Sequence, residues 1–562
     1  MFSKLISRFQ DKRSDHPLGS DASLDALLAG IPQFEPARLL LDVGNWLDGI
    51  ETSVSEIGAD AAAHALFRLD QFSRAGAEEL LVRYLSAGKR EYLRDSTWSA
   101  LEAHAARLFQ AYQATLSLAP EPKSDRDKAR TAGNGARALR AWALRKKLQH
   151  FRYRKPSAEL WMDAHNLLRV LWRLDVQQTR VVAYREEAET TPLHEYLVGL
   201  YLEFVPFGNM APQQLELAER FLRSCDGLEL TAEPHLSSTD RIDLAAGDGP
   251  QRFKPGDAGG ISVRYCSVLK LRGALMKFAA QARKPEQAPA WLGSLPATRD
   301  QITSGLLTLM TYWASKPPKR GNDRFGEKVE LRVVFGFGLA RRMIAAAHFA
   351  RSGRSFKYEG VDLDRLFSEF RFGRVEQPAA AEAAAVAQTA EPEVSSPLEI
   401  LRTLELSGDR QQMEHWLQVD SSVTGVGARV PAVLPRHQIG LLICLRSIDG
   451  LDWRLGLIRR IGRDAQNRPS IGVAMLAWPS ICAQAKPGGE ETVWNKVTEG
   501  GHGWLDAIIV SEEGRELILP AGAFVAGMAI DVRSETGRWR ARLESLLDHG
   551  EDFERIEISR IP

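Results

Sequence analysis

The chain has 562 residues, which is longer than one typical domain and predicts about two to four of them. Its 73 basic and 72 acidic residues leave a net charge of +1, so no overall field draws it to nucleic acid or to an anionic membrane. The four cysteines are widely spaced and form no Cys-x-x-Cys, which argues against a zinc site or a disulfide framework and fits a reducing compartment.

The amino-terminal residues 1–9 lack the apolar run of a signal peptide. They could form an amphipathic turn or two that touches a membrane or partner, or they could be a frayed terminus. No uncharged stretch reaches the roughly 18 residues of a membrane span. We therefore expect a cytoplasmic protein without stable membrane insertion.

Residues 1–229 are expected to form a helical domain. One apolar stripe recurs at intervals of three and four from Trp98 to Leu116, with Asp95 and Ser96 as candidate caps in front of it. A second helix is predicted after Pro156. No repeat of roughly 34 to 45 residues persists, so an irregular bundle and a short solenoid both remain possible.

A cluster of basic residues interleaved with aromatic ones lies within this helical region. Its members are Arg137, Arg140, Arg145, Lys146, Lys147, Arg152, Arg154 and Lys155, alternating with Trp142, Phe151 and Tyr153. Such a strip could grip phosphates while its rings stack on bases. The near-neutral total charge favours a solvated helix face instead, so we expect no nucleic-acid partner.

Residues 230–373 read as an α+β middle region. Strands are predicted over 261–265 and 329–335, and a helix over 339–350. The Gly336-Phe337-Gly338 sequence between strand and helix invites a dinucleotide-loop interpretation, but Arg341 replaces the third glycine of that motif. A strand-to-helix turn is the better account.

Residues 374–397 are rich in Ala, Glu and Pro and hold almost no large apolar side chains. Such a segment cannot bury enough surface to offset the entropy of ordering, so we predict a flexible linker and a domain boundary there.

Residues 398–562 are predicted to form an antiparallel β-barrel preceded by a short helix over 398–406. Nine closely spaced strands are expected, over 428–433, 439–445, 453–461, 470–475, 507–510, 515–519, 529–533, 539–543 and 553–558. The last fifty or so residues would be an extension of the barrel or a second small sheet packed on it. The whole chain is thus expected to be an α+β multidomain protein.

An Asp-x-Ser-x-x-Gly pattern at Asp420, Ser422 and Gly425 stands just before these strands. In an extended segment residues i and i+2 share a face, so the acid and the hydroxyl would project together. Gly425 and Gly427 would let the chain turn or a ligand approach the backbone. The alternative is an ordinary Asx or Ser turn at a hairpin.

This pattern, followed by many short strands, resembles the PilZ domain, a bacterial β-barrel that receives cyclic di-GMP. The resemblance implies that Asp420 and Ser422 contact a guanine base and that an upstream Arg-x-x-x-Arg holds the phosphates. Arg410 matches the first arginine, but Glu414 stands at the second position, where a carboxylate facing the ligand would repel it. Five arginines could replace the missing one or decorate the outer barrel surface: Arg429, Arg436, Arg454, Arg459 and Arg460.

No metal-ligand spacing, nucleophile motif or phosphate-binding loop occurs, so we expect neither an enzyme nor a metal or cofactor. The predicted function is a non-catalytic cyclic di-GMP receptor that relays the ligand state to the helical region. The alternative is a ligand-independent protein-interaction scaffold, and its protein partners cannot be named from the sequence. The ligand-binding candidates are Arg410, Asp420, Ser422, Gly425, Arg429 and Arg454.

Overall fold

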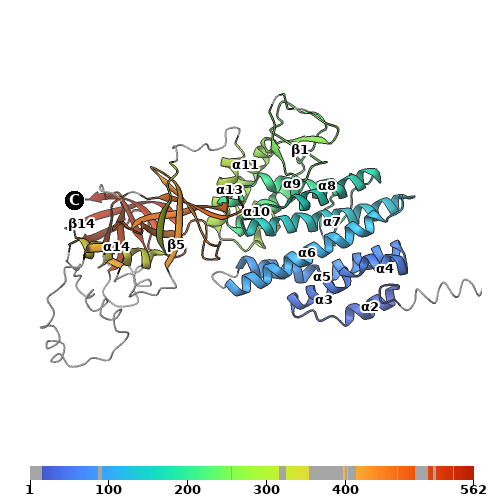
Figure 1. Ribbon diagram of the computed structural model, residues 1–562, viewed down its shortest axis with the longest axis horizontal. Helices are drawn as coiled ribbons and strands as arrows, with labels where there is room; N and C mark the ends of the chain where they lie inside the picture. The colour runs from blue at the N-terminus through green and yellow to red at the C-terminus, as the bar shows by residue number, and fades with distance from the viewer. Residues whose placement is uncertain are drawn as a thin grey trace, which may run out of the picture. The chain divides into compact units, whose positions relative to one another are not determined.

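The computed structural model divides into two compact units, Met1–Lys319 and Arg320–Pro562 (Figure 1). The structure describes residues 16–86, 91–185 (for 91–94 the backbone only), 187–254, 256–257, 259–314, 325–352, 396–398, 401–402, 413–464, 466–476, 478–487, 504–510, 514–535 and 537–561. Most of the predicted linker 374–397 lies outside these residues, and so does much of the predicted helix 398–406.

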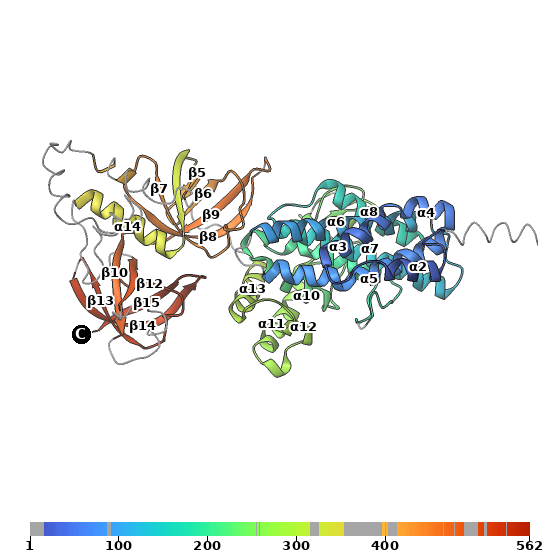
Figure 2. The ribbon, with the colours of Figure 1, turned by 90° about the horizontal axis from the view of Figure 1, so that it is seen from below.

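The first unit is mainly helical, as predicted. Its helices are α2 (Asp21–Ala29), α3 (Pro36–Asp48), α4 (Ile50–Ile57), α5 (Ala59–Ser86), α6 (Glu91–Ser117), α7 (Asp125–Phe151), α8 (Ala158–Arg173), α9 (Pro192–Tyr201), α10 (Pro212–Arg223), α11 (Leu271–Ala282), α12 (Ala290–Gly293) and α13 (Arg299–Tyr312). The long helices α5, α6 and α7 pack side by side (Figures 1 and 2). Among the residues that the structure describes, every helix is too short or too polar to cross a bilayer.

The two helix starts predicted from sequence have different outcomes. The helix after Pro156 is α8, which begins as expected because the hydroxyl of Ser157 accepts a hydrogen bond from the Leu160 amide at 3.2 Å. The prediction that Asp95 and Ser96 cap their helix is wrong, since α6 begins at Glu91 and both residues lie inside it. Asp95 instead forms an ion pair with Arg152.

The basic cluster predicted as an exposed strip is largely interior to the first unit. In α7 the buried basic residues are Arg137, Arg140, Lys146 and Lys147. Carboxylates from other helices neutralise them: Arg137 lies 3.1 Å from Asp70 of α5, and Arg140 lies 2.6 Å from Glu195 of α9. The interleaved Trp142 is fully buried as well. Both the phosphate-binding strip and the solvated face are therefore wrong for these four residues.

A small three-stranded sheet completes the first unit. Strands β1 (Asp240–Asp243), β2 (Gln251–Arg252) and β3 (Val263–Cys266) pair antiparallel in the order β2-β1-β3. Strand β3 overlaps the strand predicted at 261–265. Ile242 of β1 belongs to the same hydrophobic core as Leu275 of α11 and Leu309 of α13. This part of the predicted middle region thus packs with the helices.

The second unit begins with a closed six-stranded antiparallel barrel, which we call the first barrel. It comprises β4 (Val329–Phe335), β5 (Met413–Ser422), β6 (Gly425–Arg429), β7 (Leu442–Ser447), β8 (Arg454–Arg463) and β9 (Pro469–Met475), in the order β4-β5-β6-β9-β8-β7. Strand β4 closes this barrel by pairing with both β5 and β7. The boundary between the compact units therefore falls before β4, near residue 320, and not at residues 374–397.

A second closed antiparallel barrel follows where an extension or small sheet was expected. It contains β10 (Ser480–Pro487), β11 (Leu505–Val510), β12 (Glu516–Leu519), β13 (Ala529–Ser534), β14 (Gly537–His549) and β15 (Glu554–Ile561), in the order β10-β11-β12-β15-β14-β13. The sequence did not predict β10, because its buried positions hold Ala483, Gln484 and Ala485, which are weak β-formers.

Helix α14 (Phe337–Ser352) joins the two barrels. It starts at the predicted strand-to-helix turn, where Gly336 adopts a φ of +83° that favours glycine. The Phe337 amide donates a hydrogen bond of 2.7 Å to the Asp552 carboxylate of the second barrel. The buried face of α14 belongs to one apolar core that includes Leu442 of β7 and Ile508 of β11.

Candidate functional site

The Asp-x-Ser-x-x-Gly pattern forms the β5–β6 hairpin of the first barrel. Asp420 pairs with Gly427, and Ser422 pairs with Gly425. Because directly opposed residues share a face of a sheet, the acid, the hydroxyl and the two glycines all lie on one face. The Ser422 hydroxyl donates a hydrogen bond of 3.3 Å to the Gly425 carbonyl, which steadies the turn.

A β-bulge decides which face this is. Gln418 pairs with Ala428 and Asp420 with Gly427, so Val419 is an extra residue in β5. Before the bulge, Trp416 and Gln418 point into the barrel and are 2% and 8% exposed. After the bulge the alternation is reversed, so that Asp420 and Ser422 project from the outer surface. Both are half-buried there.

The neighbouring strands extend this face of the hairpin. We call the group the outer face; its members are Asp420 and Ser422 of β5, Gly425, Gly427 and Arg429 of β6, Ser470 and Gly472 of β9, and Arg460 and Gly462 of β8. A Cβ added to Gly472 would lie 3.3 Å from the Cβ of Arg460, and one added to Gly425 would lie 3.1 Å from a backbone oxygen. A larger residue at either position would crowd its neighbours, so glycine lets the strands pack closely and adds no side chain to this face.

Two arginines border this floor. Arg460 is exposed and stands in the same cross-strand row as Asp420, Gly427 and Gly472. Arg429 lies one row further, with its side chain 31% exposed and its guanidinium 3.4 Å from Asp464. The Nε–H of Arg429 is buried and has no hydrogen-bond partner among the described residues. The face therefore presents two cations, Arg460 and the partly exposed Arg429, that can attract an anionic ligand.

The remaining candidates are placed differently. Arg410 lies outside the described residues. Arg454 is exposed but opens β8 opposite Leu445 of β7. It is six residues from Arg460 on the same strand, which corresponds to roughly 20 Å at the usual rise per residue. The structure brings Asp420, Ser422, Gly425 and Arg429 together and leaves Arg454 at the other end of the barrel.

Glu414, the residue that departs from the PilZ pattern, faces the opposite side of the sheet. It precedes the bulge and pairs with the buried Val333, so its side chain lies on the inner face of the barrel. Its carboxylate accepts hydrogen bonds from Arg436 Nε at 2.5 Å and Trp416 Nε1 at 2.6 Å, and lies 2.9 Å from Nε2 of His437. Burial alone would raise the pKa of Glu414, but these bonds outweigh it and lower the pKa. The charge is thus engaged internally and does not point at the outer face.

Sequence reasoning missed the contribution of β9. Ser470 and Gly472 complete the floor, and their positions alternate with the buried Ile471 and Val473. That alternation marks small residues on one face of a strand, but it does not reveal which strand lies beside β6.

Most of the helical unit matches a known protein family. Residues 22–232 match the family described as "Cyclic-di-GMP receptor FimW, N-terminal domain". The match covers less than half of the chain, and it supports the expected recognition of a receptor-type protein with a long helical amino-terminal region. No curated protein matches the chain. The resemblance of the strands to PilZ stays a prediction.

Proposed function

We propose that this protein is a non-catalytic, cytoplasmic receptor for cyclic di-GMP that binds the dinucleotide on the outer face of the first barrel without a cofactor of its own. The observation that carries the proposal is the convergence of Asp420, Ser422, Arg429 and Arg460 on a glycine floor. The name of the family that matches residues 22–232 favours the same ligand.

The chemistry of the ligand fits this surface. Cyclic di-GMP carries two phosphate charges and two guanines, whose Watson–Crick edges donate hydrogen bonds to a carboxylate. Asp420 can accept from a guanine edge, while the planar guanidinium groups of Arg429 and Arg460 can pair with phosphate oxygens or stack on a base. Gly427 and Gly472 allow a ring to lie close to the strands.

The repulsion expected from Glu414 does not weigh against this proposal. Its carboxylate is held inside the barrel by Arg436, Trp416 and His437. The scaffold alternative rested on that departure, so it now becomes an outcome of the binding experiment.

Calorimetric titration of the full chain with cyclic di-GMP tests the proposal. We expect saturable binding that falls by about tenfold or more in Asp420→Ala and in Arg429→Ala, because each removes a charged hydrogen-bonding partner. Arg540→Ala is the matched control, since Arg540 pairs with Asp531 at 3.2 Å on the second barrel much as Arg429 pairs with Asp464. If no heat develops at high ligand concentration, the receptor is refuted and the scaffold stands.

The receptor would relay its ligand state by a population shift, which requires that the ligand bind one arrangement of the chain more tightly than another. Hydrogen exchange with and without cyclic di-GMP measures this. Changed protection in the helical unit of the wild type, absent in Asp420→Ala, would support a relay. Changes confined to the first barrel would contradict it.

A further inference from the structure

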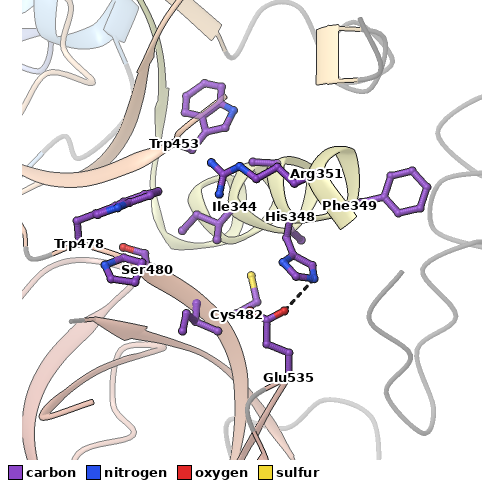
Figure 3. A pocket seen from close by; sticks show the side chains of 13 residues that line it. Ile344, His348, Phe349, Arg351, Trp453, Trp478, Ser480, Cys482 and Glu535 are labelled. Atoms are coloured by element: carbon purple, nitrogen blue, oxygen red, sulfur yellow. Dashed lines mark ion pairs between the residues drawn. The ribbon is translucent and has the colours of Figure 1, made fainter. Parts of the chain in front are cut away.

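A separate cavity lies within the second unit, beside α14. It has a volume of about 200 Å³ and is bordered by His348 and Arg351 of α14, Trp453 before β8, Trp478, Ser480 of β10 and Glu535 after β13. Figure 3 shows the Arg351 side chain reaching from the helix toward the two indoles, and Phe349 pointing away. None of these residues belongs to the outer face.

Two polar groups that border this cavity are buried and unsatisfied. The Nε1–H of Trp453 and the hydroxyl of Ser480 have no hydrogen-bond partner among the described residues. Trp453 is 1% exposed and Ser480 is 9% exposed. A buried donor without an acceptor is costly, and native proteins rarely keep two in one place. An indole N–H can only donate, so what is missing is a hydrogen-bond acceptor.

The walls and charges restrict the shape of the guest. The Trp478 ring is 40% exposed, and the Arg351 guanidinium lies 6.0 Å from its centroid. Such flat groups receive planar rings well. The charged side chains at the cavity already have partners, because Arg351 pairs with Asp452 and His348 lies 2.8 Å from Glu535 (Figure 3). The guest therefore needs no net charge.

The volume restricts its size. An apolar cavity of about 150 Å³ is known to hold benzene, so about 200 Å³ suits a ring system somewhat larger than one six-membered ring. We propose that this cavity binds a neutral, planar, bicyclic heteroaromatic compound of purine size, whose edge acceptors take the hydrogen bonds of Trp453 and Ser480. This would be a second ligand site, independent of the outer face.

Hypoxanthine and indole form a matched pair of probes for calorimetric titration of the full chain. Both are flat bicyclic molecules, but only hypoxanthine has edge acceptors. We expect hypoxanthine to bind and indole to bind at least about fivefold more weakly. Ser480→Ala should weaken hypoxanthine about fivefold, and Trp478→Ala should weaken both probes. Trp478 is partly exposed, so its removal tests the wall without opening the core.

The controls separate this site from the outer face. Ser545→Ala, which alters a half-buried serine on β14 that does not border the cavity, should leave hypoxanthine binding unchanged. Asp420→Ala should also leave it unchanged, and Ser480→Ala should leave cyclic di-GMP binding unchanged. The inference is overturned if hypoxanthine gives no heat up to about 10 mM. Equal affinity for indole, an inert Ser480→Ala, or competition with cyclic di-GMP would overturn it as well.

Discussion

Helix α7 and the outer face of the first barrel both carry arginines, but they use them in opposite ways. In α7 the cations are buried, and carboxylates from α5, α9 and α10 surround them. Burial alone would raise the pKa of Glu195, but Arg140 and Arg223 outweigh it and hold that pKa well below its usual range. The ion pairs there specify how the helices pack.

On the outer face of the first barrel the arginines are more exposed than those of α7. Arg460 is exposed and Arg429 partly so, and both border the glycines of β6, β8 and β9. Cations held in this way can meet an external anion without first breaking a buried pair. The comparison shows that the burial of a basic side chain depends on the acids it meets, and these lie far away in sequence.

The largest effect should come from breaking the α7 network. Arg140→Met removes one of the two arginines that pair with the fully buried Glu195, and we expect a loss of about 3–5 kcal/mol in the unfolding free energy of the helical unit. Urea denaturation followed by helical circular dichroism measures this. Arg130→Met is the matched control on α7, because Arg130 is 46% exposed, and it should cost about 1 kcal/mol or less. Equal losses would contradict the contrast between buried and exposed pairs.

The same unit should lose stability in mild acid. Burial lowers the pKa of His104 to about 4, whereas an unfolded histidine titrates near about 6.5. Between these values the unfolded chain binds a proton that the folded chain refuses, so stability falls as pH falls through this window. From about pH 7.5 to about pH 5 we expect His104 to account for a loss of about 2 kcal/mol.

Replacing His104 isolates this contribution. His104→Gln should flatten the pH dependence of the urea midpoint, whereas His64→Gln, at a side chain that is 54% exposed, should leave it intact. A pH profile that is the same in all three proteins would show that the burial of His104 is not what sets it.

The elements themselves could largely be predicted from sequence, but their partners could not. Alternation of apolar and polar residues located β4 over 329–335, and the Asp-x-Ser-x-x-Gly spacing located the hairpin. That β4 closes a barrel could not be seen, because its partner β5 lies about eighty residues further along the chain. The acids that bury the α7 cations are similarly remote, such as Asp70 for Arg137.

The site was predictable in composition and not in orientation. The acid and the hydroxyl share a face as the two-residue period requires. The bulge at Val419 is set by pairing with β6, and it alone places Asp420 and Glu414 on opposite faces of one strand. A simple alternation from Glu414 would have placed both on the same face.

Glu414 and Asp420 carry like charges on opposite faces of one strand in the first barrel. Glu414→Gln should cost about 1–3 kcal/mol of stability in the second unit, because it weakens the bonds from Arg436, Trp416 and His437. It should change the affinity for cyclic di-GMP by less than about twofold, since the carboxylate does not face the ligand. Glu330→Gln, at an exposed position on β4, should alter neither quantity. A marked gain in affinity would mean that Glu414 repels the ligand after all.

The smallest effect on stability should come from filling the glycine floor. A Cβ added to Gly462 meets no atom within 4 Å, so Gly462→Phe should change the unfolding free energy by only about 0.5 kcal/mol. Its ring would nevertheless stand on the outer face beside Ser470 and lower cyclic di-GMP affinity by about tenfold or more through steric exclusion. Gly293→Phe in the helical unit, also with open space around it, should leave the affinity unchanged. A stable Gly462→Phe protein that binds as tightly as the wild type would place the dinucleotide elsewhere on the molecule.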